Sequence, residues 1–407
     1  MNIHKIREDF PILDNPKKPI IYFDNACMTL RPRQVVEKMN EYYYEYPACA
    51  ERSHHRLGKK ATEEYHNART QIRKFINAKS DKEIIFTKNT TESINLVAKS
   101  FGFRRDDVII STDKEHNSNL IPWQMVAREK GLHRERVSTS YENDKAGFDM
   151  MTYEQLLKKA RSNSNRTFVS MVHTSNMDGT SIPVKEIIKT AHDYDAIVML
   201  DSAQSVPHRP IDVKKLDVDF LAFSGHKMLG PSGTGVLYGK EELLKKIAPY
   251  NVGGSTVNDT TYDSAEFTEL PERFEAGLQD YAGFIGLGET VNYLKKYIDD
   301  IHEHELKLNH IVTEGLKNHV NILGPLDSKL RSGIFSFNTK NKMDFHEVAL
   351  MLDSYANIMI RSGRHCVHSW FNANNIDGSA RASFYLYNTE EEAKFFVEKL
   401  HEIMKMK

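Results

Sequence analysis

The feature of this sequence that most constrains its fold is a repeated alternation of strand-like and helix-like segments. Short apolar runs typical of buried strands alternate with stretches at helical spacing, at 83–87, 91–101, 107–111, 119–130, 167–173, 184–192, 196–201 and 217–223. Such alternation predicts an α/β fold with a mostly parallel sheet and helices on both faces. In sheets of this kind, ligands collect at the carboxyl ends of the strands. The polar residues that follow the strands are therefore the first candidates for a functional site.

The last of these strand-like runs leads into Ser224-Gly225-His226-Lys227, and a stretch of small residues follows at 230–235. A lysine delivered by a strand end into a glycine-lined space can lose its hydration, fall in pKa and form an imine with an aldehyde. Pyridoxal phosphate is the strongest candidate for that aldehyde. Because a lysine after a strand is by itself more often an ordinary surface residue, the other strand ends decide between the two interpretations.

Those strand ends carry groups that fit the same cofactor. Asp201 ends the run 196–201 and can keep a pyridine nitrogen protonated, which makes the ring an electron sink, while Gln204 can donate to the phenolate oxygen. Thr90 and Thr91 lie between a strand and a helix, where free backbone amides suit a phosphate. Simple helix capping is the alternative for Asp201 and the threonines. Further candidates are a stacking ring at His116, an amide at Asn176, and phosphate contacts from Ser224 and His226.

The chain before and after this region is organised differently. Helices are expected at 3–7, 32–46 and 57–76, and the lysine is followed by a strand at 235–239, a short helix at 241–246 and a loop at 253–267. A long helical region at 281–317, interrupted near Asp299 and Asp300, leads to a smaller α+β domain with strands at 333–337, 358–361 and 380–386 and helices at 346–355 and 390–404. We therefore expect an N-terminal arm (1–20), a large cofactor-binding domain (21–290) and a small C-terminal domain (291–407).

Cys366 is a candidate nucleophile in the predicted small domain. It lies in Arg361-Ser362-Gly363-Arg364-His365-Cys366, a segment crowded with groups that are positive or can become so. Such surroundings favour the thiolate, so we interpret Cys366 as a reactive thiol. Arg381, with Arg361 as a second candidate, can hold a substrate carboxylate with two parallel hydrogen bonds. A surface ion pair is the alternative for either arginine.

The composition of this 407-residue chain restricts its partners. The 55 Lys and Arg residues balance 56 Asp and Glu, so no overall field attracts nucleic acid or an anionic membrane. No apolar stretch is long enough to span a bilayer and the N-terminal sequence lacks a signal pattern, which predicts a cytoplasmic protein. Three cysteines are too few for a disulfide framework. Cys27 and Cys49 could form a relay or a metal pair, but we interpret them as incidental buried thiols and expect no metal site.

Taken together, these residues resemble the class V branch of the fold type I pyridoxal phosphate enzymes, and within it the cysteine desulfurases of the SufS type. The resemblance covers nearly the whole chain, through segments at 22–26, 90–92, 115–116, 122–124, 175–176, 201–204, 224–227, 273–277, 363–366 and 381–383. It implies a large domain built on a seven-stranded type of sheet, and a small domain that carries the catalytic cysteine.

The resemblance also implies a reaction. Lys227 would hold the cofactor and later shuttle protons, under a ring on which His116 stacks. L-Cysteine would bind through Arg381, and attack by Cys366 on the substrate's sulfur would give L-alanine and a persulfide. His55 matches a substrate-side histidine of the family. Members are homodimers that share cofactor contacts across the interface, and they supply sulfur for iron-sulfur cluster assembly or another thiolation route.

Several positions depart from the family pattern and leave alternatives open. The family commonly has Ala at Cys27, His at Arg364, and at Leu278 a Thr that donates to the other subunit's phosphate; Glu51 also replaces a His. The short connection from Cys366 to Arg381 resembles members that need a sulfur-acceptor protein. Selenocysteine lyase activity is a close alternative, and a class V aminotransferase, epimerase or lyase acting on another amino acid is a second. A catalytically silent sulfur carrier is a third.

Overall fold

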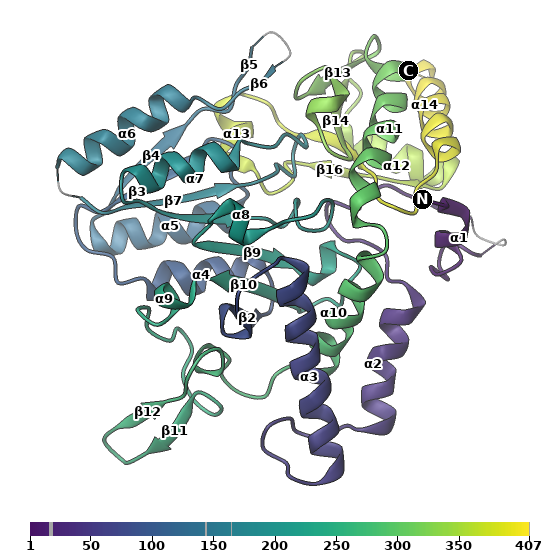
Figure 1. Ribbon diagram of the computed structural model, residues 1–407. Coiled ribbons are helices and arrows are strands. Elements are labelled where there is room, and N and C mark those ends of the chain that lie inside the picture. Colours follow the sequence, from purple (N-terminus) through teal and green to yellow (C-terminus); the bar gives the residue numbers. More distant parts are fainter. Residues whose placement is uncertain (16–18, 143–144, 164, 407) are drawn as a thin grey trace.

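The chain forms a large helix-covered sheet with a smaller sheet beside it, and both termini lie next to the smaller one (Figure 1). This computed structural model describes residues 1–15, 19–142, 145–163 and 165–406. Positions 16–18 of the predicted arm lie outside the described residues. Among the described residues, no helix combines the length and the apolar character needed to cross a membrane.

The large sheet has seven strands in the order β2-β10-β9-β8-β7-β3-β4. They are β2 (Ile84–Thr87), β3 (Val108–Thr112), β4 (His133–Val137), β7 (Thr167–Val172), β8 (Ile197–Asp201), β9 (Phe220–Ser224) and β10 (Gly235–Gly239). Strand β10 runs antiparallel to both neighbours, and the remaining pairs are parallel. The predicted mostly parallel sheet is confirmed, because strands buried on both faces read as continuous apolar runs.

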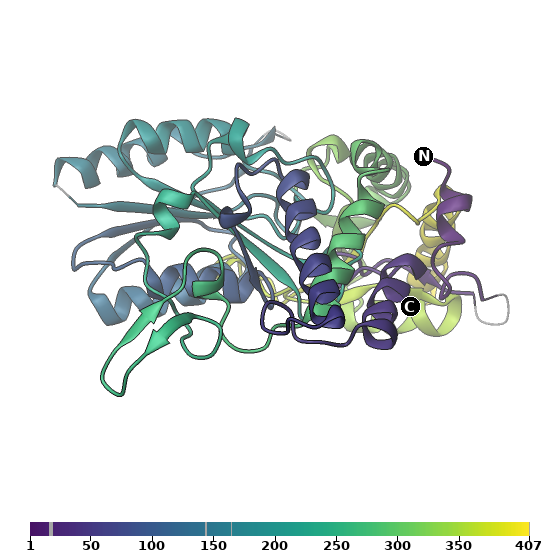
Figure 2. The same cartoon turned by 60° about the horizontal axis from the view of Figure 1, so that its bottom comes forward.

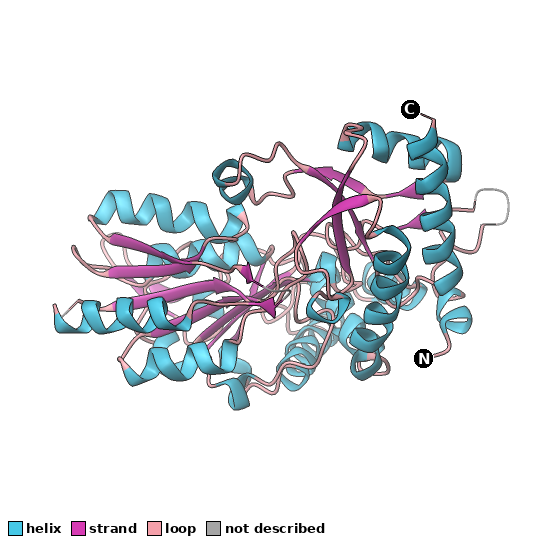
Figure 3. Cartoon of the chain, turned by 90° about the horizontal axis from the view of Figure 1, so that it is seen from above, coloured by secondary structure: helices cyan, strands magenta, loops and turns pink. Residues whose placement is uncertain are grey.

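Helices cover both faces of this sheet, as Figure 3 shows. Successive strand residues point to opposite faces. Ile109 therefore packs into the cluster that contains residues of α4 (Thr90–Ser100) and α5 (Asn117–Lys130). Its neighbour Ile110 packs into the cluster that contains residues of α6 (Met150–Ser162) and α7 (Val184–Asp193). These two cores fix the sheet, so that its strand ends can hold polar residues in place.

Three helices pack side by side at the edge of the large sheet (Figure 2). They are α2 (Arg33–Glu45), α3 (Arg56–Phe75) and α10 (Tyr281–Leu294). A buried ion pair anchors α3, in which Arg69 meets Glu275 with an Nη1–Oε1 distance of 2.7 Å. Short helices and 3-10 turns complete the connections. The helices are α1 (Ile3–Arg7), α8 (Val213–Leu216) and α9 (Glu241–Leu244), and the turns are η1 (Asp81–Glu83), η2 (Gly225–Lys227), η3 (Glu272–Phe274) and η4 (Ser328–Leu330).

The smaller sheet is antiparallel, with the order β13-β14-β17-β16. Its strands are β13 (Val320–Leu323), β14 (Ile334–Thr339), β16 (Arg361–Gly363) and β17 (Ser379–Ser383), and its helices are α11 (Ile298–Leu316), α12 (Phe345–Ala356), α13 (His368–Ala373) and α14 (Glu390–Lys405). Strand β1 (Ile21–Tyr22) pairs with β15 (Ile358–Met359), and Phe23 joins the core of this sheet. The N-terminal segment thus reaches across the chain to the small sheet, and the division at 290/291 remains a prediction.

Some sequence-based expectations about local structure were wrong. The region 253–267 is not a loop, because it contains a hairpin of β11 (Val257–Thr260) and β12 (Ala265–Phe267) that projects from the body (Figure 1). Its strands are largely exposed, and their polar residues do not form the apolar run that predicts a buried strand. The long helix breaks at 295–297 rather than near Asp299 and Asp300, which occupy the first turn of α11. Acidic residues there complement the helix dipole.

Other elements were not expected at all. Strand β4 is buried only at its last residue and β13 only at its two ends, so neither forms a continuous apolar run, and the six-residue helix α13 is too short to show a periodicity. Helix α6 was not expected either, nor was the antiparallel pairing of β5 (Tyr141–Glu142) with β6 (Lys145–Ala146). The predicted strand at 358–361 is two short strands, β15 and β16.

Candidate active site

A cavity of about 220 Å³ lies where strands β8 and β9 end and where the small sheet meets the large one. All of the predicted site residues except Gln204 and His55 line it, namely Thr90, Thr91, His116, Asn176, Asp201, Ser224, His226, Lys227, Arg361, Cys366 and Arg381. These residues come from both sheets and from segments more than 200 positions apart in the chain. The structure therefore brings together what the sequence could only suggest as separate strand ends.

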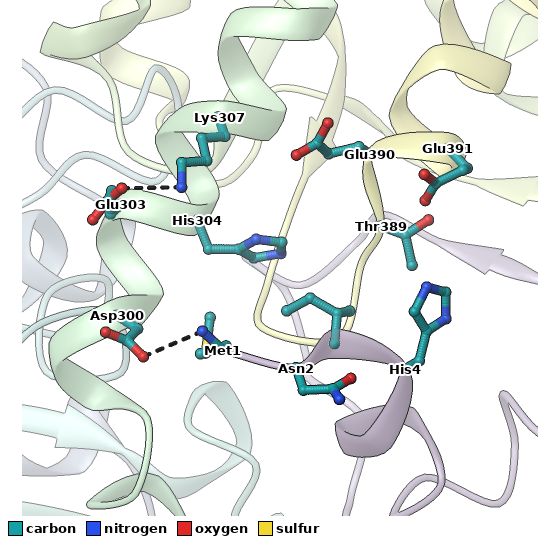
Figure 4. A pocket seen from close by; sticks show the side chains of 11 residues that line it. Met1, Asn2, His4, Asp300, Glu303, His304, Lys307, Thr389, Glu390 and Glu391 are labelled. Carbon is teal, nitrogen blue, oxygen red and sulfur yellow. Dashed lines mark hydrogen bonds and ion pairs between the residues drawn. The ribbon is translucent and has the colours of Figure 1, made fainter.

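A larger cavity of about 520 Å³ lies elsewhere, between the N-terminus, α11 and the start of α14 (Figure 4). Its polar walls already hold ion pairs from the Met1 amine to Asp300 and from Lys307 to Glu303. None of the predicted site residues lines it. We therefore place the candidate active site in the smaller cavity.

Lys227 and Asp201 form the centre of the smaller cavity. Lys227 follows β9 in the turn η2 and is half-buried, and Asp201 is the last residue of β8 with 3% of its surface exposed. Burial lowers the pKa of the Lys227 amine, and the Asp201 carboxylate opposes that shift. Burial likewise raises the pKa of Asp201, with Lys227 opposing it. A less basic amine is a better nucleophile at neutral pH.

The first turn of α4 and the end of β9 form one wall. The Thr90 amide donates to Ser224 Oγ at 2.9 Å, and the Thr90 and Ser224 hydroxyls lie 2.7 Å apart. The backbone of β10 approaches closely here, because a Cβ on Gly235 would lie 2.5 Å from the Asn89 Cα. His226 stays neutral, since burial and then Lys227 lower its pKa to about 4. Hydroxyls at a helix N-terminus suit a phosphate.

His116 faces the same cavity as the N-cap of α5, where its Nδ1 accepts from the Ser118 amide at 3.1 Å. Burial, followed by the charge of Lys227, lowers the pKa of its ring to about 3. The preceding Glu115 is fully buried and accepts from Thr112, Asn119 and the backbone of Val172. A neutral, flat ring on a fixed turn is suited to stacking on an aromatic cofactor.

Two arginines form the opposite wall. Arg361 and Arg381 are register partners on β16 and β17. Arg381 is 1% exposed, donates from Nη1 to the Asn176 carbonyl at 2.9 Å and from Nη2 to Asp24 at 3.2 Å, and leaves its Nε without a hydrogen-bond partner among the described residues. Burial lowers the pKa of Arg381, Asp24 opposes that shift and Arg361 adds to it. Such a pair of cations can bind a carboxylate.

Cys366 is half-buried and lies in a tight turn directly after β16. His365 and Cys366 both adopt left-handed backbone angles, with φ of 50° and 60°. The Asn176 amide donates to the His365 carbonyl at 2.7 Å, and the Asn117 amide nitrogen of the backbone donates to the Cys366 carbonyl at 2.7 Å. Two residues of the large-sheet part of the chain thus hold the turn of Cys366 at the cavity that Lys227 also lines.

Two predicted site residues do not line the cavity. Gln204 donates from Nε2 to the Ala26 carbonyl at 2.7 Å, so the donor assigned to the phenolate oxygen is already used within the protein. Its Oε1 is buried without a partner in the part of the chain that the structure describes. His55 caps α3, where Nδ1 accepts from the Gly58 amide at 3.3 Å, and it is exposed. Neither side chain contributes to the cavity of its own chain.

Of the residues that depart from the family pattern, Cys27 lines the cavity, whereas Arg364 and Leu278 do not. Arg364 points away from the cavity, because its Nε donates to the Asp377 carbonyl at 2.9 Å and its Nη1 to Asn372 at 2.8 Å. Leu278 is exposed. Cys27 lines the cavity and accepts from Arg361 Nη1. Cys27 is thus half-buried at the cavity and not fully buried, and its incidental role remains a prediction, whereas Cys49 contacts Tyr281 and lies outside the cavity.

Sequence reasoning did not assign three further groups that shape the site. Asp24 holds Arg381, Glu115 fixes the turn of His116, and His365 lines the cavity with its ring bonded to Ser379 Oγ at 2.9 Å. Burial and then Arg381 lower the pKa of His365 well below its ordinary value. The sequence signal that could have identified these groups is proximity along the chain, since each lies within three residues of Cys27, His116 or Cys366.

Comparison with known proteins agrees with this geometry. Residues 21–396 match the family described as Aminotransferase class-V. The chain belongs to this family. Its members use pyridoxal phosphate, and the residues here fit that cofactor: a buried Asp201 with one backbone partner, an amine at Lys227 whose pKa burial lowers, and hydroxyls at a helix N-terminus.

Individual members resemble the chain over nearly its full length. A probable cysteine desulfurase of Synechocystis is 40% identical, with 97% of this chain and 94% of the relative aligned, and one of Pyrococcus abyssi is 41% identical, with 98% and 97% aligned. The apo structure of a cysteine desulfurase from Thermococcus onnurineus NA1 is 40% identical, covers 99% of this chain and 98% of its own, and superposes with a TM-score of 0.92.

Proposed function

We propose that this class-V family member is a cysteine desulfurase, which converts L-cysteine to L-alanine and carries the sulfur as a persulfide on Cys366. The observation that carries this proposal is that Lys227, Cys366 and the Arg361–Arg381 pair line one cavity. An amine, a thiol and a carboxylate-binding pair together match the three functional parts of the reaction. Relatives of about 40% identity that are named cysteine desulfurases support it.

Bound pyridoxal phosphate would supply an aldehyde for the substrate's amino group and an electron-poor ring that delocalises electrons from the α-carbon. The residues that would hold it are Lys227 at the aldehyde, Asp201 at the pyridine nitrogen, Thr90, Thr91, Ser224 and His226 at the phosphate, and His116 on the face of the ring. Asn176 lines the cavity and could donate to the ring oxygen, but in this structure its amide binds the His365 carbonyl.

The chain's own groups would then handle the substrate. Arg381, with Arg361 beside it, would bind the carboxylate and orient the substrate's sulfur toward Cys366. The Cys366 thiolate attacks that sulfur, so that the carbon–sulfur bond breaks as the sulfur–sulfur bond forms. The Lys227 amine would remove the proton from the α-carbon and later return a proton to the carbon that lost sulfur. The products are alanine and the Cys366 persulfide.

The experiment measures alanine and persulfide formed from L-cysteine by the purified holoenzyme and by Cys366→Ala. We expect wild type to form both products, and the variant to keep the absorbance of the bound cofactor but to form neither. A variant that still releases alanine at the wild-type rate would overturn the role of Cys366. Wild type that holds the cofactor but leaves cysteine untouched would overturn the substrate, and selenocysteine in the same assay tests the lyase alternative.

We propose further that the enzyme is of the SufS type. The Cys366 turn is short and bound by Asn117 and Asn176, which restrains the persulfide inside the cavity and favours delivery to a dedicated sulfur-acceptor protein for iron-sulfur cluster assembly. The protein would act in the cytoplasm as a homodimer. His55 supports the dimer, because an exposed residue outside its own cavity can serve the cavity of a second copy.

A further inference from the structure

The candidate active site contains two thiols rather than one. Cys27 and Cys366 are both half-buried and line the same cavity of about 220 Å³. Burial lowers the pKa of Lys227, and Cys27 and Cys366 are both close enough to that amine to oppose the shift. The two thiols thus share one small space with the same lysine.

A chain of hydrogen bonds connects the turns that carry these thiols. Asp24, which begins the turn of Cys27, accepts from Arg381 Nη2 at 3.2 Å. Arg381 Nη1 donates to the Asn176 carbonyl at 2.9 Å, and the Asn176 side chain donates to the His365 carbonyl at 2.7 Å. Arg381, Asn176 and His365 are all buried. Because their hydrogen bonds connect the two turns, the fold sets the positions of the thiols relative to each other.

Cys27 also has the surroundings of a nucleophile. Arg361 donates a hydrogen bond from Nη1 to its Sγ, and the Lys227 and Arg381 charges lie nearby. A guanidinium that donates to sulfur stabilises a thiolate. Cys49 differs, because its thiol lies 3.8 Å from the uncharged Tyr281 hydroxyl and outside the cavity.

We propose that Cys27 is a second sulfur-carrying residue, which takes over the outer sulfur of the Cys366 persulfide; this rests on the proposed function. The Cys27 thiolate attacks the outer sulfur, a new sulfur–sulfur bond forms at Cys27, and the bond between that sulfur and Cys366 Sγ breaks. Cys366 leaves as a thiolate, and the hydrogen of the persulfide moves with the outer sulfur. One disulfur bond replaces another and one thiolate replaces another, so the step needs no oxidant or reductant. Cys366 is then free for a second turnover.

The test locates sulfur within the holoenzyme. Enzyme freed of reductant receives a few equivalents of L-cysteine, is quenched at successive times with an alkylating reagent, and is digested for peptide mass spectrometry. Tryptic cleavage after Arg33, Lys38 and Arg364 places the three cysteines in separate peptides. The variants are Cys27→Ser and Cys366→Ala, with Cys49→Ala as the matched control.

We expect the persulfide on Cys366 first and on Cys27 later, with Cys49 unlabelled and Cys49→Ala like wild type. Cys27→Ser should carry sulfur on Cys366 alone, and its initial burst of alanine should fall from two equivalents per chain to one. Cys366→Ala should carry no sulfur on Cys27. The inference is overturned if Cys366 is labelled and Cys27 never is, if Cys27 is labelled in Cys366→Ala, or if a Cys27–Cys366 disulfide forms with release of sulfide. Absence of alanine from wild type would instead reject the proposed function.

Discussion

The side-chain amide of Asn176 donates a hydrogen bond of 2.7 Å to the backbone carbonyl of His365. Asn176 follows strand β7 of the large sheet, and His365 precedes the thiol of Cys366 in the other part of the molecule. Both residues are buried, and the Asn176 carbonyl accepts a second hydrogen bond, from Arg381 Nη1. This contact, together with the hydrogen bond from the Asn117 backbone amide to the Cys366 carbonyl, holds the proposed nucleophile against the large-sheet part of the chain.

Removing this link should slow sulfur transfer more than it affects cofactor retention. Asn176→Ala removes one buried hydrogen bond, which is worth about 1.4 kcal/mol or roughly tenfold in rate if it serves to position the thiol. The measurement is the single-turnover rate of persulfide formation on Cys366, followed beside the absorbance of the bound cofactor. An unchanged rate would contradict the positioning role, and a shifted absorbance would reveal a contact with the cofactor itself.

Arg381 should govern substrate binding. Replacing it with Ala removes a charge-assisted pair of hydrogen bonds to the carboxylate, so we expect kcat/KM for cysteine to fall by about 10- to 100-fold. Arg381→Lys should recover only part of the loss, because an ammonium lacks the planar fork. The measurement is steady-state alanine release across a range of cysteine concentrations.

Arg364 provides the matched control for Arg381. It is close in sequence to Cys366, but its guanidinium binds Asp377 and Asn372 outside the cavity. Arg364→Ala should therefore change kcat/KM far less than Arg381→Ala does. Equal losses in both variants would contradict the assignment of Arg381 as the carboxylate site.

Except for Gln204, the residues that the sequence assigned to the cofactor line one cavity, because their positions depend on local patterns. Asp201 and Lys227 each follow a buried strand, and the carboxyl ends of parallel strands meet at one edge. The apolar runs that identify the strands also locate these residues. The alternation predicted the mostly parallel sheet, but it gave no strand order and did not place β10 between β2 and β9.

The substrate end could not be predicted in the same way. Cys27 lies more than 300 positions before Arg361, and their contact arises because β1 pairs with β15 of the small sheet. A two-residue strand has no pattern that would reveal such a pairing. The position of His55 is equally non-local, since the helix it caps packs at the edge of the large sheet, away from the cavity of its own chain.

His116 should make the folded protein sensitive to acid. Its pKa is about 3 when folded and 6.5 ordinarily, so between these values the unfolded chain binds a proton that the folded chain does not. Stability therefore falls as pH drops below about 6.5. From about pH 8 to about pH 5, His116 should account for a loss of about 2 kcal/mol.

The difference between wild type and His116→Phe isolates this contribution. Urea unfolding of the cofactor-free proteins at both pH values should show the smaller loss in the variant. His66 gives the contrasting control, because a hydrogen bond from its ring to the Glu51 carboxylate raises its pKa and its contribution has the opposite sign. Equal acid losses in wild type and His116→Phe would contradict a buried, neutral His116.

Glu275 should be the ionic group on which stability depends most clearly. It accepts from Arg69, Tyr65 and the Phe86 backbone, and the Arg69–Glu275 pair is 1% and 3% exposed. Glu275→Gln leaves the Arg69 charge buried without compensation, which should cost about 3–5 kcal/mol in the free energy of unfolding. Lys317→Gln breaks an exposed pair with Glu314 and should leave the urea midpoint unchanged. Similar midpoints for both variants would contradict the prediction.

The last prediction concerns the proposed dimer. If His55 of one protomer serves the cavity of the other, Lys227→Ala and His55→Ala protomers should complement each other in a mixed dimer. One site then has Lys227 from the His55 variant and His55 from the Lys227 variant, while the other site carries both defects. One of the two sites in the isolated mixed dimer is then intact, so its activity should return to about half of wild type.

Co-expression with two affinity tags yields the mixed dimer, and each variant alone sets the baseline. Complementation above both baselines requires a shared site, because protomers that use their own His55 would combine an intact lysine only with a missing histidine. A mixed dimer with no more activity than its parents would contradict the shared site. Full activity of His55→Ala alone would show instead that His55 takes no part in binding the substrate, and the exposed start of α3 would then serve only as a helix cap.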